Sequence, residues 1–302
     1  MKKDLLKLLD LTKDDILEIL NLADQMKYNI RHGIAHRVLE GKTLAMIFSK
    51  SSTRTRVSFE TGMYQLGGQA LFLSHNDLQI GRGEPVEDTA RVLSRYVHGI
   101  MIRTFEQSEV EALAKWASIP VINGLTDFAH PCQILADLMT VREYHSALEG
   151  VKMAYIGDGN NVCNSLIVGA LKTGMKMAVA TPPGYEPHAD ILTFAKENTD
   201  FTLVNNPEEA VTGADVLVTD VWASMGQEDE ATKRMKDFAG FQINDKTMSL
   251  AHPKAIVLHC LPAHRGEEIT ADVFEKHADS IFDEAENRLH AQKAVMALLM
   301  GE

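Results

Sequence analysis

Hydroxyl and guanidinium side chains gather in a short stretch near residue 50. Ser52-Thr-Arg-Thr55 follows the apolar segment 43–48 and precedes apolar residues that recur every three, four or seven positions up to Gly67-Gly68. The first pattern predicts a buried strand and the second a helix. A helix start directs free backbone N–H groups and the positive end of the helix dipole toward one place. We therefore expect an anion site there, with hydroxyl and guanidinium donors suited to a phosphate.

Two arginines in this stretch cannot share one ligand. Arg54 and Arg56 are two residues apart, which separates them by about 200° around a helix. We expect Arg54 to bind the anion and Arg56 to have a structural role. Taken alone, the stretch is more typical of an ordinary helix cap beside solvated arginines.

The composition bounds the class of protein. The chain has 302 residues, of which 45% are hydrophobic and 24% charged, as in globular proteins long enough for two domains. A net charge of −12 disfavours a nucleic-acid or anionic-membrane partner. Cys132, Cys163 and Cys260 are odd in number and far apart, which indicates reduced thiols. The charged N-terminal segment is not a secretory signal, and no apolar run is long enough to span a bilayer, so we expect a cytoplasmic protein.

Apolar segments and amphipathic segments alternate along the whole chain. Strands are expected at 43–48, 69–73, 99–103, 120–123, 152–156, 176–180, 202–205, 216–220 and 256–259. Helices are expected at 13–31, 53–66, 86–96, 107–117, 132–148, 162–173, 188–197 and from 286 onward. This alternation predicts an α/β protein with two doubly wound parallel-sheet domains and an active site in the cleft between them.

Polar residues follow the predicted strands, where open parallel sheets bind ligands. They are Ser52–Thr55, Arg103, His130 with Gln133, Gly157–Asn161, Asp220 with Ser224, and Cys260. Arg103 could instead pair with a neighbouring helix. With Arg54 and His130, it would supply donors for a phosphate joined to a carbonyl group.

Two other kinds of site are disfavoured. Gly157-Asp-Gly-Asn-Asn161 lacks the third glycine of a dinucleotide turn, since Val162 follows, and its asparagines could instead bind a small zwitterion. His259, Cys260 and His264 lack the spacing of a structural zinc site, and we expect neither a metal nor another cofactor. We expect Cys260 to have a positioning role rather than a nucleophilic one.

Together these motifs resemble the signature set of the aspartate/ornithine carbamoyltransferase family, in its ornithine-using form. The motifs are Ser52-Thr-Arg-Thr55, His130-Pro-Cys-Gln133, Asp220-Val-Trp-Ala-Ser-Met-Gly226 and His259-Cys-Leu-Pro262. Gly83-Glu-Pro85, Asp88-Thr-Ala90 and Glu286-Asn-Arg288 extend the resemblance over essentially the whole chain. These motifs show no departure from the family pattern.

The resemblance implies transfer of a carbamoyl group from carbamoyl phosphate to the δ-amine of L-ornithine, within arginine metabolism. The amine would attack directly, and the site would stabilise the resulting oxyanion. It implies a carbamoyl phosphate-binding domain (1–133 with 286–302), a linking helix (134–149) and an ornithine-binding domain (150–285). It also implies a homo-oligomer, most simply a trimer, in which Gln79 reaches a neighbouring site.

The resemblance also assigns residues to roles. Carbamoyl phosphate would contact Ser52, Thr53, Arg54, Thr55, Gln79, Arg103, His130, Pro131, Cys132, Gln133, Cys260, Leu261 and Arg288. Ornithine would contact Asn161, Asp220, Ser224 and Met225. Catalysis would depend on Arg54, Thr55, Arg103, His130 and Cys260.

Three alternatives remain open. The acceptor could be putrescine or an N-acylated ornithine, although Ser224-Met-Gly226 disfavours them. The chain could be a catalytically silent sensor of small molecules, or a nicotinamide-dependent dehydrogenase. An aspartate acceptor is disfavoured because Asp220 has the wrong sign for a dicarboxylate.

Overall fold

The computed structural model describes residues 3–223 and 230–301. The chain divides into two compact units, unit 1 (1–139 and 286–302) and unit 2 (140–285). Each unit contains one sheet in which every pairing is parallel. The predicted fold class, two parallel-sheet α/β domains, is confirmed.

Unit 1 has the strand order β2-β1-β3-β4. The strands are β1 (Thr43–Phe48), β2 (Gln69–Ser74), β3 (Gly99–Arg103) and β4 (Val121–Leu125). The inner strand β3 is buried along its whole length because helices cover both faces, whereas the edge strand β2 is partly exposed. Arg103 pairs with Phe48 on one side and with Leu125 on the other, so three strands end side by side.

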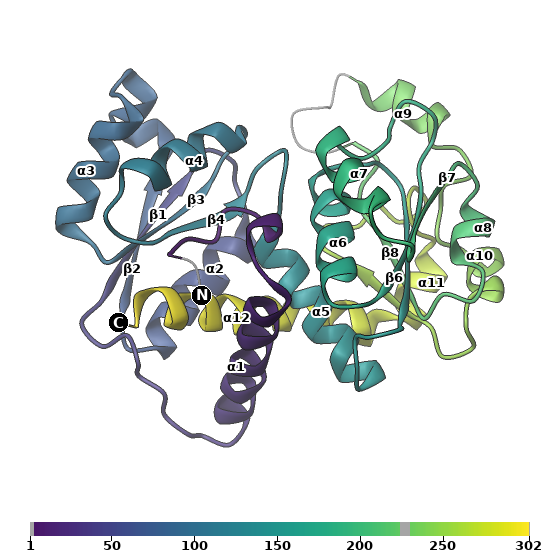
Figure 1. Ribbon diagram of the computed structural model, residues 1–302, viewed down its shortest axis with the longest axis horizontal. Coiled ribbons are helices and arrows are strands. Elements are labelled where there is room, and N and C mark those ends of the chain that lie inside the picture. The colour runs from purple at the N-terminus through teal and green to yellow at the C-terminus, as the bar shows by residue number, and fades with distance from the viewer. Residues whose placement is uncertain (1–2, 224–229, 302) are drawn as a thin grey trace. The chain divides into compact units, whose positions relative to one another are not determined.

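The helices of unit 1 lie on both faces of its sheet (Figure 1). On one face, α3 (Val86–Tyr96) and α4 (Gln107–Trp116) pack on alternate residues of β1 and β3, including Ala45, Ile47, Ile100 and Ile102. On the other face lie α1 (Lys13–Arg31), α2 (Thr53–Gln65) and the last part of α12 (Ala278–Met300). Short 3-10 helices occur at Leu8–Asp10, His75–Asp77 and Ile80–Arg82.

Unit 2 has the strand order β7-β6-β5-β8-β9. The strands are β5 (Lys152–Ile156), β6 (Lys176–Ala180), β7 (Phe201–Val204), β8 (Val216–Thr219) and β9 (Ile256–His259). Thr219 pairs with Ile156 and with His259. The next residue of each of these strands, Gly157, Asp220 and Cys260, therefore lies at one edge of the sheet.

Helices also cover both faces of the sheet in unit 2 (Figure 1). One face carries α6 (Asn161–Lys172) and α7 (Ala189–Lys196), and the other carries α8 (Pro207–Val211), α10 (Asp245–Leu250) and α11 (Ala271–Lys276). The helix α9 (Ala231–Asp237) follows the segment 224–229, which is outside the described residues. The helices α5 (Pro131–His145) and α12 have residues in both units.

Several predicted boundaries are wrong. The last helix begins at Ala278, eight residues before Glu286, because nothing in 278–285 interrupts it. The helix α5 ends at His145 rather than at 148, because Ser146 adopts a left-handed conformation with φ of 63°. The helices α8 to α11 were not predicted, since five to seven residues are too few for a periodic pattern.

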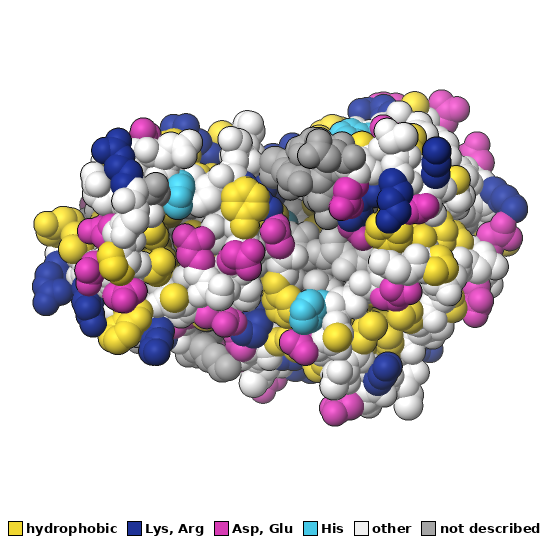
Figure 2. All heavy atoms as spheres, turned by 90° about the horizontal axis from the view of Figure 1, so that it is seen from above, with side chains coloured by type: hydrophobic (Ala, Val, Ile, Leu, Met, Phe, Trp, Pro, Cys, Tyr) yellow, Lys and Arg dark blue, Asp and Glu magenta, His cyan; other side chains and the backbone are white. Residues whose placement is uncertain are grey.

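The surface is acidic overall but mixed in detail. On the face drawn in Figure 2, Lys and Arg side chains are interspersed with Asp and Glu. No helix within 3–223 and 230–301 combines the length and the apolar character needed to cross a membrane.

Candidate active site

The start of α2 has the geometry that the sequence predicts. Ser52 is the N-cap residue, and its hydroxyl accepts a hydrogen bond from the Thr55 amide at 3.2 Å. Thr53 and Arg54 are the first two residues of the helix, so their N–H groups belong to the turn that has no carbonyl partner within the helix. The residue Thr55 is fully buried. The N-terminus of α2, which follows β1, can therefore bind an anion.

Cationic side chains converge on the same place within unit 1. Arg288 of α12 donates a hydrogen bond from Nη2 to Thr55 Oγ1 at 3.0 Å. Arg103 is buried at the end of β3. His130 is also buried, and its burial, followed by the charges of Arg288, Arg103 and Arg54, lowers the pKa of its imidazole well below the usual value. The imidazole is therefore neutral near pH 7 and lies within the field of three guanidinium groups.

The start of α5 supplies three more of the predicted residues. Pro131 is the first residue of the helix, next to His130. The Cys132 thiol donates to the Asn123 carbonyl at 3.4 Å, and burial raises its pKa to about 12. Its side chain therefore stays protonated in the core. Gln133 is buried and donates from Nε2 to Asp137 Oδ1 at 2.8 Å.

We call Ser52, Thr53, Arg54, Thr55, Arg103, His130, Gln133 and Arg288 the phosphate half-site. The structure does not bring Gln79 into this group: it is exposed and precedes the 3-10 helix Ile80–Arg82. Among the described residues, no hydrogen bond joins its side chain to the half-site. Arg56 pairs with Glu60 at 3.0 Å and lies over the Phe72 ring at 3.8 Å from its centroid. These contacts fit the structural role predicted for it.

Sequence reasoning missed Lys50 beside the phosphate half-site. This lysine is buried, forms an ion pair with Asp127 and lies over the Phe105 ring at 4.2 Å from its centroid. The pair connects the segment after β1 with the segment after β4. The only available signal was the position of Lys50 two residues before Ser52, because its partner is 77 residues away.

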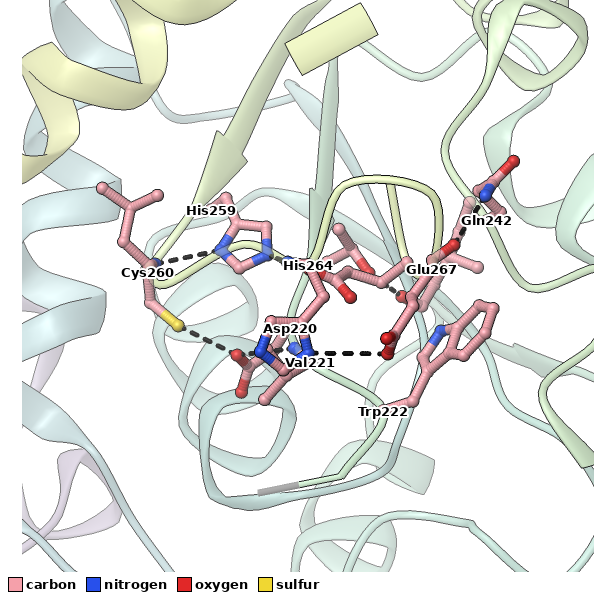
Figure 3. Close-up of polar contacts among 12 residues, drawn as sticks. Asp220, Val221, Trp222, Gln242, His259, Cys260, His264 and Glu267 are labelled. Carbon is pink, nitrogen blue, oxygen red and sulfur yellow. Dashed lines mark hydrogen bonds and ion pairs between the residues drawn. The ribbon is translucent and has the colours of Figure 1, made fainter. Parts of the chain in front are cut away.

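Asp220 is the centre of a second polar cluster, in unit 2. Its Oδ1 accepts hydrogen bonds from the Cys260 thiol at 3.1 Å and from the Val221 amide at 2.8 Å (Figure 3). Its Oδ2 accepts from Asn160 Nδ2 at 2.8 Å. This carboxylate is buried at the end of β8, so it presents a negative charge in a fixed orientation.

The asparagines of the second cluster start α6. Asn160 is the N-cap residue, and its Oδ1 accepts from the amides of Val162 and Cys163 at 3.0 and 3.1 Å. Asn161 is half-buried, and its Oδ1 accepts from the Val162 amide at 2.9 Å. The turn that resembles a dinucleotide motif is therefore a helix cap bound to Asp220. We call Asn160, Asn161, Asp220, Cys260 and Leu261 the amine half-site.

A buried histidine and glutamate hold the Cys260-Leu261 segment. His259 and Glu268 are fully buried and lie 3.0 Å apart, between Nε2 and Oε1. The His259 Nδ1 accepts from the Leu261 amide at 2.9 Å, so the ring proton must lie on Nε2 and be donated to Glu268. Leu261 has a φ of 60°, unusual for a bulky residue, which indicates that these bonds hold it in place.

Ligand atoms of Asp220, His259 and Cys260 lie within 4.8 Å of one another. A cation there would need one His259 nitrogen, and each of the two nitrogens already has a hydrogen-bond partner. Two further predicted ligands of ornithine, Ser224 and Met225, lie outside the described residues.

Comparison with known proteins identifies the class to which this fold and these half-sites belong. Residues 3–143 match the carbamoyl-P binding domain of aspartate/ornithine carbamoyltransferases, and residues 149–299 match the Asp/Orn binding domain. The chain belongs to the aspartate/ornithine carbamoyltransferase family, as its motifs predicted. Residues 286–299 match the second domain model although they pack in unit 1.

Within this family, the chain is similar to ornithine carbamoyltransferases. It is 58% identical to one from Carboxydothermus hydrogenoformans, over 99% of this chain and 98% of the relative. The structure of ornithine carbamoyltransferase from Pyrococcus furiosus has a TM-score of 0.95 at 54% identity, covering 99% of this chain and 97% of that one. The anabolic enzyme from Campylobacter jejuni has a TM-score of 0.93 at 44% identity, covering 99% of both chains.

Proposed function

We propose that this protein transfers the carbamoyl group of carbamoyl phosphate to the δ-amine of L-ornithine, giving L-citrulline and phosphate. The observation that carries the choice of acceptor is the buried Asp220 carboxylate, bonded to Asn160 and Cys260. Its negative charge suits the α-ammonium of ornithine, whereas the two carboxylates of aspartate would require cations. The relatives named above support the same acceptor.

The phosphate half-site would hold the donor. The phosphate would accept hydrogen bonds from the backbone at Ser52, Thr53 and Arg54, from the Thr53 hydroxyl, and from the Arg54 guanidinium. Gln133 and the backbone at Pro131 and Cys132 would bind the carbamoyl end. As the C–O bond breaks, the leaving phosphate gains charge where the helix dipole and Arg54 already favour it.

Three donors would stabilise the transition state. When the amine attacks the carbonyl carbon, negative charge develops on the carbonyl oxygen. Thr55, Arg103 and the neutral imidazole of His130 would donate to that oxygen, each contributing about 3 kcal/mol. The lowered pKa of His130 suits this role, because it keeps the imidazole neutral. A neutral imidazole still has one N–H group, which can donate a hydrogen bond without transferring its proton.

The amine half-site would hold the acceptor. Asp220 would bind the α-ammonium, while Asn161, Ser224 and the backbone at Met225 would bind the carboxylate. Cys260 and Leu261 would lie where the donor and the acceptor meet. The bond from the Cys260 thiol to Asp220 supports an orienting role, since the proton on sulfur is engaged and a thiolate nucleophile is not required.

We further propose the domain roles implied by the motifs. Residues 1–133 with 286–302 would bind carbamoyl phosphate, 134–149 would link the domains, and 150–285 would bind ornithine. The protein would act in the cytoplasm, in arginine metabolism.

The proposal includes a homotrimer. In unit 1, apolar side chains are exposed on α2, on the edge strand β2 and on α3: Val57, Tyr64, Phe72, Val92 and Tyr96. The Gln79 loop continues directly from β2, so a second copy covering the β2 edge of unit 1 would meet it. Light scattering should give the mass of three chains, and Tyr64→Asp should lower that mass. Phe282→Asp, which changes an exposed aromatic residue of unit 2, is the control.

One assay tests the activity. Citrulline formation from carbamoyl phosphate and L-ornithine is compared with carbamoylation of putrescine and of N-acetylornithine under identical conditions. We expect L-ornithine to be preferred by kcat/KM. A preference for either of the other amines would assign a different acceptor, and no product with any amine would favour a sensor.

A further inference from the structure

Arg234 is a buried arginine of α9 whose side chain reaches two other segments of unit 2. Its Nη1 donates to Asp158 Oδ2 at 2.9 Å and to the Trp222 carbonyl at 2.9 Å. Its Nε donates to Glu230 Oε2 at 3.2 Å. The side chains of Arg234 and Asp158 are only 8% and 10% exposed. This is a buried ion pair with an additional bond to the backbone.

Two aromatic rings lie beside this guanidinium. It lies over the ring of Tyr185 at 5.0 Å and near that of Phe238 at 6.0 Å from the centroids. Tyr185 is itself held by a hydrogen bond from its hydroxyl to Asp237 at 2.7 Å. A planar fork can stack on rings while it donates from its edge, which the ammonium of a lysine cannot do.

The two segments bound by Arg234 carry Asn160, Asn161 and Asp220 of the amine half-site. Asp158 lies between β5 and α6 and is followed closely by Asn160 and Asn161. Trp222 comes two residues after Asp220. The hydrogen bond from Asn160 to Asp220 connects the same two segments. Arg234 therefore provides a second connection between the two segments that the proposed acceptor must contact together.

The charge on Asp158 depends on this partner. Burial raises the pKa of Asp158 to about 6, and the charges of Asp220 and Glu230 act in the same direction, while Arg234 lowers it. Removing the guanidinium would leave a buried carboxylate without its cation, and breaking a buried pair in this way strongly destabilises a folded protein. The loop from 157 to 161 would then have to rearrange or take up a proton.

We propose that Arg234 is a positioning residue for the acceptor: by joining Asp158 to the Trp222 backbone, it sets the spacing of the amine half-site and thereby the affinity for ornithine. Arg234 needs no contact with the substrate to do so. The inference rests on the proposed function and adds a residue that determines affinity for one substrate of two.

Steady-state kinetics of the full-length protein tests this, with the two substrates varied separately. Arg234→Gln should raise KM for ornithine about tenfold or more, while KM for carbamoyl phosphate changes less than about twofold. Lys236→Gln removes the same charge from an exposed position of the same helix and should behave like the wild type. An unchanged KM for ornithine, or an equal rise in both constants, would overturn the proposal.

Two further variants separate positioning from a general loss of stability. Arg234→Lys keeps a charge beside Asp158 but loses the stacked fork, so it should restore part of the ornithine affinity. Asp158→Asn combined with Arg234→Gln should raise KM for ornithine no more than the larger single effect, because both act through one contact. Additive effects, or no recovery with lysine, would contradict the inference. If Arg234→Gln does not fold, Arg234→Lys decides it: a rise in KM for ornithine alone supports the proposal, and unchanged or equally raised constants overturn it. A wild-type protein that forms no citrulline would instead refute the proposed function.

Discussion

Arg288 and Thr55, 233 residues apart in the chain, share a hydrogen bond of 3.0 Å from the guanidinium Nη2 to the hydroxyl oxygen. The Ser52 hydroxyl donates to the same oxygen at 3.1 Å. With both lone pairs of Thr55 engaged, its hydroxyl hydrogen is left to donate. The last helix of the chain therefore helps to orient a hydroxyl at the first turn of α2 as a donor, which is what an oxyanion contact requires.

Replacing Arg54 should remove most of the activity. This arginine is the guanidinium carried by the first turn of α2, where the phosphate would bind, so Arg54→Ala should lower kcat/KM by about a hundredfold to a thousandfold. Arg56→Ala is the matched control on the same helix. Its side chain is 48% exposed and pairs with Glu60, so its loss should change kcat/KM by less than about threefold. Near-normal turnover by Arg54→Ala would remove this residue from the site.

Replacing the Cys260 thiol with a hydroxyl should slow the reaction without stopping it. Serine retains a donor toward Asp220 Oδ1, which cysteine contacts at 3.1 Å, so Cys260→Ser should keep the acceptor oriented. We expect kcat to fall about ten- to a hundredfold, and further in Cys260→Ala, which has no donor. Mass spectrometry of the wild type during turnover should find no carbamoyl adduct on sulfur. A trapped carbamoyl-thioester would show that Cys260 is a nucleophile.

The sequence predicts the strands and their ends well, because β3, β8 and β9 are short runs buried along their whole length, and a polar residue at or directly after the end of such a run emerges at one edge of the sheet. Arg103, Asp220 and Cys260 could therefore be named in advance. Lys50 and Arg234 could not, because their partners Asp127 and Asp158 are 77 and 76 residues away and no local pattern encodes such a pairing.

The imidazole of His130 should not titrate near pH 6.5. Burial and the charges of Arg288, Arg103 and Arg54 lower its pKa, so the folded protein keeps the neutral ring at pH values where an unfolded chain would be protonated. The stability linked to this group is complete above about pH 6.5 and is lost as the pH falls below it, because only the unfolded state then binds the proton. NMR of the imidazole signal, assigned by comparison with His130→Asn, measures the pKa. A midpoint near 6.5 for that signal would contradict the buried cationic environment.

A methyl group at Gly159 should disturb the amine half-site through the backbone. A Cβ at this position would overlap with backbone atoms of Glu186 and Pro187 and lie 2.6 Å from the Tyr185 carbonyl oxygen. That carbonyl now accepts a hydrogen bond from the Gly159 amide at 2.9 Å, so the two segments cannot separate without losing it. We expect Gly159→Ala to lower the free energy of unfolding by about 1–3 kcal/mol. Because Asn160 is the next residue, KM for ornithine should rise as well.

Gly184→Ala is the control for that substitution. Gly184 has a φ of 88°, and the space that a Cβ would occupy is open, so alanine there meets only the strain of the left-handed conformation, about 1 kcal/mol, with no clash. Urea unfolding compares the two variants, and ornithine-dependent kinetics separates their effects on the site. Gly159→Ala could instead prove as stable as Gly184→Ala and bind ornithine as the wild type does. The tight packing between the loop 157–161 and the segment 185–187 would then have no part in shaping the amine half-site.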